Sequence, residues 1–492
     1  MPKKNIIIIG SGVAGLATAL RLSHAGYQVR VFESNNHVGG KMSEIRHDGY
    51  RFDTGPSLFT MPQLIDELIA MGDDCSSSFF EYLKIDITCR YFFNDGVILN
   101  AYSDTDKFVQ EVSLKTKTEN WVIIKYLKYI EFVYKATSKI FIEKSLHKLS
   151  TYLSFTTFKS FLKLPFLSIF KTMDQTNRTR LGNDKLIKIF NRYATYNGSN
   201  PFVAPGILSV IAHLELNKGV FLPKKGMRSI VNCLYDICLK KGVEFNLNSQ
   251  VDKISLNNNK VNGIYIKDIF FPADIVISNI DIHYVYTKLL DKPIYFTQKK
   301  NIERSTSAII FYWGIKKRFN QLDLHNILFT KNYAKEFDEI NNFHAIQNDP
   351  TIYINITSKH LPEDAPKNCE NWFVMINVSH DKGQNWKLLV QKAREQIITK
   401  INHLLNTDIE SFIDYENYMD PTQIESKTGA FQGALYGSSS NKRMSAFLRH
   451  PNFSNKIQNL YFCGGTVHPG GGIPLALNSA KIVANEIISN EK

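Results

Sequence analysis

The chain has 492 residues, of which 43% are hydrophobic and 21% are charged. This length exceeds one ordinary core, so we expect two or three packed units, and the composition excludes a disordered chain, a coiled coil and a collagen. The 59 lysines and arginines outnumber the 46 acidic residues, and the net charge of +13 suits nucleic acid, acidic lipid or a polyanionic cofactor. The 6 scattered cysteines form no CxxC pair, which indicates neither a disulfide framework nor a metal site and favours a reducing compartment.

The N-terminal segment joins two lysines to an apolar run, as a secretory signal does. The spacing of the glycines within the run indicates a different role. Elsewhere no stretch approaches the roughly 18 uninterrupted apolar residues that a membrane-spanning helix needs. We therefore expect a soluble or peripheral protein and not an integral one.

The first 33 residues predict a β-α-β unit with a glycine turn. A β-branched run at Ile6–Ile9 predicts a buried parallel strand, and a second strand ends at Glu33. Between them, Gly10 permits a tight turn, Gly12 lets the backbone approach a pyrophosphate, and Gly15 lets the helix pack on the strand. The helix N-terminus attracts phosphates. Glu33 can accept hydrogen bonds from ribose hydroxyls and disfavours NADP, so the unit predicts a dinucleotide site.

A Gly-Gly pair follows the acid and carries a resemblance to a known family. The sequence HVGGK at 37–41 and DTGPS at 53–57 are similar to segments of the superfamily of flavin-containing amine oxidases and phytoene desaturases. The resemblance implies FAD as the cofactor, with Glu33 at the adenosine ribose. It also places a group of residues along the pyrophosphate, the ribityl chain and the isoalloxazine, namely Gly40, Lys41, Gly55, Pro56 and Ser57.

A central block resembles the same superfamily. A turn at Pro223–Gly226, a helical pattern from Arg228 and a strand ending near Val251 match a block whose final valine contacts adenine, so the resemblance places Val251 there. Lys225 departs from the glycine that is common in this turn. Ala273–Asn279 is similar to a returning strand of the same fold.

The C-terminal block is the most specific. The sequence GGTVHPGGGIPLAL at 464–477 combines a glycine-dense loop with the start of a helix, which offers backbone N–H groups to an anion. It resembles the carotenoid desaturases, in a form most similar to the hydroxycarotenoid 3,4-desaturase branch, and DTGPSLFTMP at 53–62 favours the same branch. The implied cofactor contacts here are Gly465, Thr466, Gly472 and Ile473.

One histidine in this loop is a weak catalytic candidate. His468 can take a proton from the substrate or hydrogen-bond the flavin ring, and the alternative is that it holds the loop through a backbone contact. Asp53 and Glu33 are interpreted as structural or cofactor-directed residues and not as bases.

Residues 121–172 differ in character from the rest of the chain. Nine lysines minus two glutamates give this stretch a charge of +7, interleaved with phenylalanine and leucine. Phe155 and Phe158 share one face of a helical pattern while Lys159 and Lys163 lie on another. Such a helix is typical of a membrane interface, although the pattern also fits a helix that packs on a protein core with its lysines in water. No nucleic-acid-binding motif accompanies the lysines, so nucleic acid is not expected.

The motifs and the resemblance together predict an α/β fold. A Rossmann-type FAD-binding domain of the amine-oxidase kind is expected to carry an inserted α+β substrate domain and a helical membrane-facing segment. We expect the FAD-binding domain to be discontinuous, at residues 1–80, 197–283 and 425–492. The substrate and membrane-associating domain takes residues 81–196 and 284–424.

The resemblance implies an FAD-dependent carotenoid desaturase. It would form a C=C bond, at the 3,4 position of a 1-hydroxylated acyclic or monocyclic carotene, by hydride transfer to flavin. Phytoene desaturase is the alternative, followed by a carotenoid isomerase or saturase and by a non-catalytic prenyl-lipid-binding module of the same fold. No second glycine fingerprint for a nicotinamide is present, so oxygen or a membrane quinone is the expected electron acceptor. We expect a cytoplasmic protein that attaches peripherally to the cytoplasmic membrane.

Overall fold

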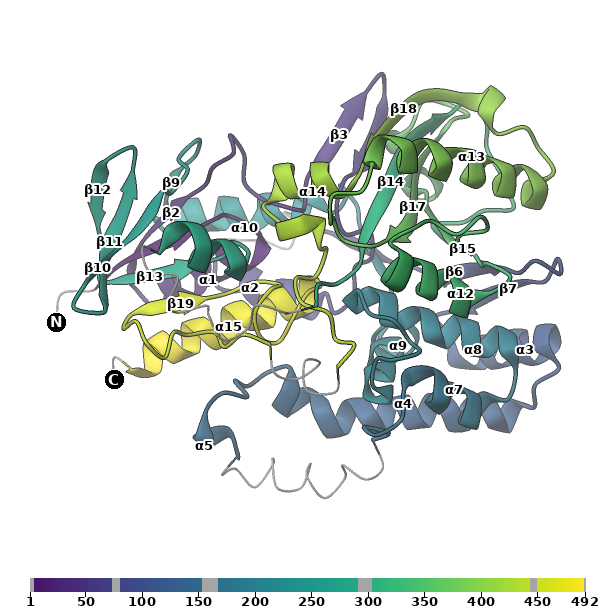
Figure 1. Ribbon diagram of the computed structural model, residues 1–492, viewed down its shortest axis with the longest axis horizontal. Helices are drawn as coiled ribbons and strands as arrows, with labels where there is room; N and C mark the ends of the chain where they lie inside the picture. The colour runs from purple at the N-terminus through teal and green to yellow at the C-terminus, as the bar shows by residue number, and fades with distance from the viewer. Residues whose placement is uncertain (1–3, 73–79, 153–166, 291–302, 443–448, 491–492) are drawn as a thin grey trace.

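The computed structural model describes residues 4–72, 80–152, 167–290, 303–442 and 449–490. Figure 1 shows a five-stranded sheet at the left, a seven-stranded sheet at the upper right and a layer of helices below the larger sheet. Both termini lie beside the smaller sheet.

The five-stranded sheet is parallel and draws its strands from widely separated parts of the chain. Its order is β19-β13-β1-β2-β9. The predicted β-α-β unit is present as its centre. The strands are β1 (Asn5–Ile9), β2 (Gln28–Phe32), β9 (Glu244–Asn246), β13 (Ile275–Ser278) and β19 (Leu460–Phe462).

Alternation along β1 explains how this sheet is covered on both faces. Ile6 and Ile8 point to the helices α1 (Val13–His24), α10 (Arg228–Lys240) and α15 (Ile473–Asn490). Ile7 and Ile9 point to the opposite face, which is covered by the three-stranded antiparallel sheet of β10 (Lys253–Asn257), β11 (Lys260–Ile266) and β12 (Ile269–Pro272).

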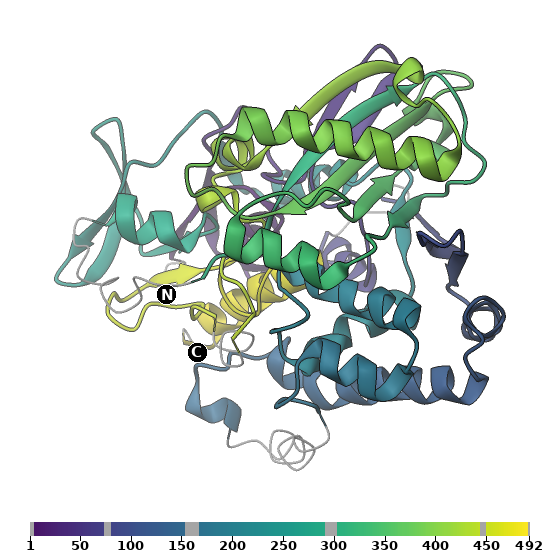
Figure 2. The same cartoon turned by 45° about the vertical axis from the view of Figure 1, so that its right-hand side comes forward.

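The seven-stranded sheet has the order β18-β14-β17-β16-β15-β6-β7 and is antiparallel except where β15 pairs with β6. The helix α13 (Trp386–Leu405) lies across one face, as Figure 2 shows. The opposite face carries Ile310 and Phe373 toward the interior of the molecule. The strands are β6 (Ile87–Phe92), β7 (Ile98–Tyr102), β14 (Ser307–Ile315), β15 (His325–Leu328), β16 (Ile352–Asn355), β17 (Glu370–Val378) and β18 (Ile413–Met419).

The helical layer shares one hydrophobic core with the edge of this sheet. Residues 206–216 pack in this core with α4 and α7. The predicted division places them in the FAD-binding domain, and that division stays a prediction. The elements of the layer are α3 (Thr105–Thr116), α4 (Asn120–Phe141), α7 (Met173–Leu181), α8 (Asp184–Asn191), η3 (Arg192–Asn197), η4 (Gly206–Ser209), α9 (Val210–Leu216) and α12 (Tyr333–Asp338).

Short elements connect these layers. They are β3 (Glu44–His47), β4 (Tyr50–Asp53), α2 (Gln63–Ile69), β5 (Tyr82–Lys84), α5 (Leu149–Tyr152), β8 (Phe221–Pro223), α11 (Ile282–Tyr284), η5 (Val285–Leu289), η7 (Glu339–Phe343), η8 (Thr357–Lys359), η9 (Pro362–Asp364), η10 (Glu410–Phe412), α14 (Pro421–Thr428) and η11 (Phe431–Gly433).

The basic segment at 121–172 is only partly described. On α4, the apolar side chains of Ile123, Ile130 and Val133 are buried in the helical core, whereas Lys125 and Lys128 are exposed. This helix therefore matches the alternative in which the apolar face packs on protein. The expected amphipathic helix around residues 155–163 lies outside the described residues, so it stays a prediction. No described helix is both long enough and apolar enough to cross a membrane.

Candidate active site

A cavity of about 870 Å³ lies between the carboxyl ends of β1 and β2 and the inner face of the seven-stranded sheet. Ligands of open parallel sheets bind outside the carboxyl ends of the strands, so this position fits the predicted dinucleotide site. The structure brings together on its walls every predicted cofactor contact except Gly15, namely Gly10, Gly12, Glu33, Gly40, Lys41, Gly55, Pro56, Ser57, Val251, Gly465, Thr466, Gly472 and Ile473.

The first glycine turn presents the N-terminus of α1 to the cavity. Gly12 is the N-cap, and no described side chain caps the helix there, so the first N–H groups of α1 face the cavity. A Cβ on Gly12 would lie 2.7 Å from Asn279 Nδ2, and a Cβ on Gly15 would lie 2.3 Å from the carbonyl oxygen of Gly10. Gly12 thus lets Asn279 approach the turn at the cavity wall, while Gly15 lets α1 pack on the turn.

Asn279 was not predicted to belong to the site. It follows β13 and lines the cavity, and its Oδ1 lies 3.0 Å from the Cβ position of Gly464. Its amide therefore contacts both glycine loops, which come from opposite ends of the chain. The sequence feature that could have indicated Asn279 is its place as a polar residue directly after a buried β-branched strand.

Glu33 ends β2 with a buried carboxylate that is already hydrogen-bonded. Its Oε2 accepts from Ser11 N (2.8 Å) and Ser11 Oγ (2.7 Å), and its Oε1 accepts from Asn35 N (3.0 Å) and Asn35 Nδ2 (2.8 Å). Burial raises the pKa of Glu33, but the hydrogen bonds from Asn35 and Ser11 outweigh burial and hold this pKa below its usual value. The cavity wall therefore carries an anion, and a ribose hydroxyl can replace the side-chain donors.

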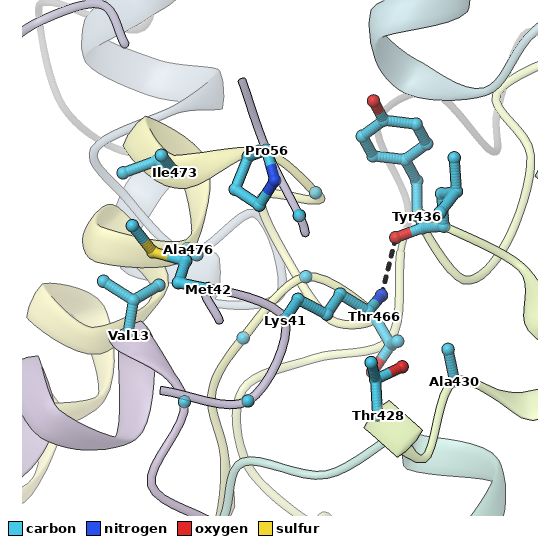
Figure 3. A pocket seen from close by; sticks show the side chains of 18 of the residues that line it. Val13, Lys41, Met42, Pro56, Thr428, Ala430, Tyr436, Thr466, Ile473 and Ala476 are labelled. Carbon is cyan, nitrogen blue, oxygen red and sulfur yellow. Dashed lines mark hydrogen bonds between the residues drawn. The ribbon is translucent and has the colours of Figure 1, made fainter. Parts of the chain in front are cut away.

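Lys41 extends from the second glycine turn into the cavity (Figure 3). Its Nζ donates a hydrogen bond to the carbonyl oxygen of Leu435 at 2.7 Å. Burial lowers the pKa of Lys41, and the carboxylate of Asp281 opposes that shift. The contact joins the turn after β2 to the segment that precedes the C-terminal glycine loop.

A buried ion-pair cluster anchors the strand that leads to Gly55. Arg51 donates from Nε to Asp364 Oδ1 (2.6 Å) and from Nη1 to Asp53 Oδ1 (2.9 Å). Asp53 Oδ1 also accepts from the backbone N–H of Met227 (3.0 Å), just before α10. Asp53 does not line the cavity, and these contacts give it the structural role that was expected.

The C-terminal glycine loop forms another wall and leads into α15. Arg449 is buried behind this loop and donates from Nη1 to the carbonyl oxygens of Tyr436 (2.7 Å) and Gly465 (3.2 Å). Burial lowers the pKa of Arg449 to about 10. Since α15 begins at Ile473, a second helix N-terminus meets the cavity.

His468 lies in this loop but does not line the cavity. Its Nε2 is 2.8 Å from the carbonyl oxygen of Lys144, and its backbone N–H donates to the carbonyl oxygen of His450 at 2.9 Å. The ring packs edge-on against His147. These contacts match the loop-holding alternative, and a catalytic role for His468 stays a prediction.

Beyond the glycine loops the cavity continues as an apolar arm that sequence reasoning missed. Its walls come from the end of α4, from η4 and α9, and from the inner face of the larger sheet. Several polar side chains also reach this region, among them Arg192, Tyr196 and Glu215. The only signal in the sequence was the cluster NRYATY at 191–196. The apolar side chains include Phe141, Ile142, Ile207, Leu208, Ile211, Leu214, Ile310, Phe373 and Met375.

The geometry fits FAD along the polar part of the cavity. Two helix N-termini and the glycine turns suit a diphosphate, and Glu33 and Val251 line the end where a ribose and an adenine would lie. Lys41, Pro56 and Thr466 line the part that remains for the ring system (Figure 3). The fold and the site thus define a flavin-dependent oxidoreductase.

The chain belongs to the flavin-containing amine oxidoreductase family, whose model matches residues 13–488. This membership confirms the predicted α/β fold of the amine-oxidase kind, the flavin cofactor FAD and the oxidoreductase class.

Relatives match the chain over nearly its whole length. It is 51% identical over 484 residues to a 1-hydroxycarotenoid 3,4-desaturase of Flavobacterium sp. (strain P99-3), covering 98% of this chain and 99% of the relative. It is 30% identical over 518 residues to a phytoene desaturase of Fusarium fujikuroi, covering 99% of this chain and 90% of the relative. Cyclohexylamine oxidase from Brevibacterium oxydans IH-35A superposes with a TM-score of 0.62 at 14% identity, covering 100% of both chains. At that identity, the likeness shows the fold alone.

Proposed function

We propose that this protein is an FAD-dependent carotenoid desaturase that forms the 3,4 double bond of a 1-hydroxylated acyclic or monocyclic carotene. The observation that carries the proposal is the 51% identity to a protein named 1-hydroxycarotenoid 3,4-desaturase. The apolar arm supports it, because a wall of aliphatic and aromatic side chains suits a long hydrocarbon.

The chain's own residues would mainly orient the substrate and exclude water. Bound FAD supplies the hydride acceptor. The apolar arm shields the polyene, and the Pro56 and Thr466 loops flank the ring position. As the hydride leaves an allylic carbon, positive charge spreads along the polyene and the neighbouring C–H becomes acidic, so a weak base suffices. Two hydrogens leave the substrate, one as hydride and one as a proton, and one C=C bond forms.

A pigment assay tests this proposal. Cells that make one candidate carotene at a time would express the protein, and the products would be separated by chromatography. Loss of two hydrogens from the hydroxylated carotene, with phytoene unchanged, is the expected result. Stepwise conversion of phytoene to coloured products would establish the phytoene desaturase alternative. An FAD-bound protein that changes neither substrate would contradict both and leave an isomerase, a saturase or a lipid-binding module.

The cofactor contacts form part of this proposal. We assign the ribose contact to Glu33, the adenine contact to Val251, and the pyrophosphate and flavin contacts to the glycine loops with Lys41, Pro56, Ser57, Thr466 and Ile473. Their shared position on one cavity wall supports the assignment. Oxygen or a membrane quinone would accept the electrons, and adding either one to anaerobically reduced protein while following the flavin absorbance would identify which.

Peripheral attachment to the cytoplasmic face of a membrane completes the proposal. Large apolar side chains are exposed on and beside the helical layer, including Trp121 (62% exposed), Ile124 (39%) and Phe170 (76%). Lys125 and Lys128 are exposed on the same helix as Trp121. Apolar side chains beside lysines suit an interface with anionic lipid.

A further inference from the structure

A buried ion pair interrupts the apolar arm. Arg192 on η3 and Glu215 on α9 have side chains that are 3% and 1% exposed, and their charged groups approach to 2.8 Å. Both line the cavity together with Tyr196. Burying two charges is costly unless their hydrogen bonds are met, and a plain hydrocarbon ligand gives no reason to keep them there.

The hydrogen bonds of this ion pair use all but one N–H donor of Arg192 and leave an acceptor lone pair on Glu215. Arg192 donates from Nε (3.2 Å) and Nη2 (2.7 Å) to the Tyr91 hydroxyl. It also donates from Nη1 to Tyr196 and from Nη2 to Glu215 (2.8 Å), so four of its five N–H groups are taken. Glu215 accepts from Arg192 and Tyr193 at Oε1, and from Tyr196 at Oε2 (2.7 Å). Within the described part of the chain, one N–H of Nη1 and one lone pair of Oε2 remain, and a hydroxyl group matches this combination.

The pair lies near the loop assigned to the flavin ring. Tyr353, also in the cavity wall, shares a hydrogen bond of 2.7 Å with Ser57 Oγ in that loop. Arg192 and Glu215 line the same cavity as Tyr353, which contacts the flavin loop directly.

The short helix η3 provides a second link. Asn197, at its far end, lines the cavity and accepts a hydrogen bond of 2.8 Å from Arg449. Arg449 in turn bonds the carbonyl oxygen of Gly465 in the C-terminal glycine loop. Five residue steps of a 3₁₀ helix span roughly 10 Å, so Arg192 is about that far from this contact along the helix.

We infer that Arg192 and Glu215 bind the hydroxyl group at the end of the carotene and thereby select the bond that is oxidised. This inference rests on the proposed function and deepens it. Nη1 of Arg192 donates to the hydroxyl oxygen and Oε2 of Glu215 accepts its hydrogen. The 3,4 bond begins two carbons from the carbon that bears the 1-hydroxyl, so holding the hydroxyl at a fixed point of this cavity also fixes the position of the bond relative to the flavin loop. A carotene without the hydroxyl leaves two buried charged groups short of a hydrogen bond.

Matched variants and matched carotenes test the inference. The full-length FAD-bound protein would be offered a 1-hydroxylated carotene and the same carotene without the hydroxyl, each in detergent micelles. Affinity would come from the carotene absorbance and turnover from chromatography. Glu215→Gln removes one charge, and Arg192→Met combined with Glu215→Leu removes both, so that no unpaired charge is buried. Tyr193→Phe is the control, because it removes a hydrogen bond to the same carboxylate from a side chain outside the cavity wall.

The wild type and Tyr193→Phe are expected to bind the hydroxylated carotene at least about tenfold more tightly than its parent. The double variant should bring this ratio close to one with unchanged FAD occupancy, and Glu215→Gln should give an intermediate ratio. A double variant that binds FAD and keeps the wild-type preference would overturn the inference. If the wild type binds the hydroxylated carotene more tightly but does not desaturate it, the proposed function is contradicted and the hydroxyl subsite is supported. If it desaturates the hydroxylated carotene but binds both carotenes with equal affinity, the proposed function is supported and the hydroxyl subsite is contradicted.

Discussion

Glu33 shows how one carboxylate can serve two sets of donors. In the structure, Ser11, Ser34 and Asn35 supply its hydrogen bonds. Two of these donors are backbone N–H groups that hold the carboxylate in place, and three are side chains that can turn away. A ribose hydroxyl can therefore donate a hydrogen bond to an anion that is already oriented and already desolvated.

Glu33→Arg should abolish FAD binding while the protein remains folded. The substitution replaces an acceptor with a donor beside a dinucleotide ribose. FAD occupancy, measured from the ratio of flavin to protein absorbance, should fall by more than about tenfold with little change in the far-ultraviolet circular dichroism. Glu244→Arg is the control, since Glu244 is exposed on the neighbouring strand and does not line the cavity. Full FAD occupancy in Glu33→Arg would show that the ribose contact is assigned wrongly.

His325 should make stability fall as the pH is lowered. Burial lowers its pKa from 6.5 to about 3, so the unfolded chain binds a proton at a higher pH than the folded protein does. This contribution is therefore fully present above about pH 6.5 and is lost between pH 6.5 and 3 as the pH falls, at up to about 1.4 kcal/mol per pH unit. Urea unfolding at pH 7 and 5.5 should show the wild type losing about 1 kcal/mol more than His325→Gln. Equal losses in the two proteins would show that His325 is not buried in its neutral form.

The conformation of some elements is determined by their local sequence, whereas the position of others depends only on tertiary packing. The turn from β1 into α1 needs glycine at Gly12 and Gly15 because a side chain would clash, and such requirements are visible in a sequence. From the sequence alone, Ile211 and Phe373 are predicted to be ordinary core residues. Their place in the cavity wall depends on contacts between distant helices and strands, which no local pattern encodes.

The position of α9 illustrates the same limit. The apolar residues at 206–216 predict burial, but they do not specify which core they join. The sequence-based division gives residues 197–283 to the FAD-binding domain, and within that range residues 207–216 pack with α4 and α7. Adjacency in the sequence does not specify such packing, because this polypeptide passes between the two large sheets several times.

The strand β4 should depend on its buried ion-pair cluster. Asp364→Asn removes the charge of one of the three carboxylates that pair with Arg51, whose side chain is 4% exposed. Weakening a buried pair is expected to lower the free energy of unfolding by about 3 kcal/mol. Glu131→Gln breaks an exposed pair with Lys135 on α4 and should change it by less than about 0.5 kcal/mol. Denaturant unfolding of the two variants would measure the difference, and similar values would contradict a structural role for the cluster.

The helix α4 should contribute to membrane attachment through its exposed end. Replacing Trp121 and Ile124 with alanine should reduce flotation with anionic vesicles several-fold, because the apolar area that enters the interface is lost. Leu388→Ala is the control, since Leu388 is 61% exposed on α13. In Figure 1 the helix α13 lies on the opposite side of the larger sheet from α4. Equal flotation of both variants and the wild type would place the attachment elsewhere.

Across the whole molecule, both sheets contribute walls to a shared cavity. The carboxyl ends of the parallel strands supply the polar part, and the larger sheet and the helical layer supply the apolar arm. Cofactor and substrate would therefore lie end to end, with Lys41 and Ser57 near the junction. The buried cluster of Arg51, Asp53 and Asp364 connects the same two units away from the cavity.

This arrangement predicts that the two parts of the cavity can be blocked separately. Ile211→Trp should fill the apolar arm, so that carotene binding falls by more than about tenfold while FAD occupancy is unchanged. Val251→Trp should crowd the adenine end and lower FAD occupancy while the apolar arm still takes up carotene. Overpacking of this kind costs about 1 to 3 kcal/mol, so thermal unfolding should confirm that both variants are folded. The decisive measurement is flavin and carotene content in the same preparation, because loss of both ligands in either variant would mean that they share one region and do not lie end to end.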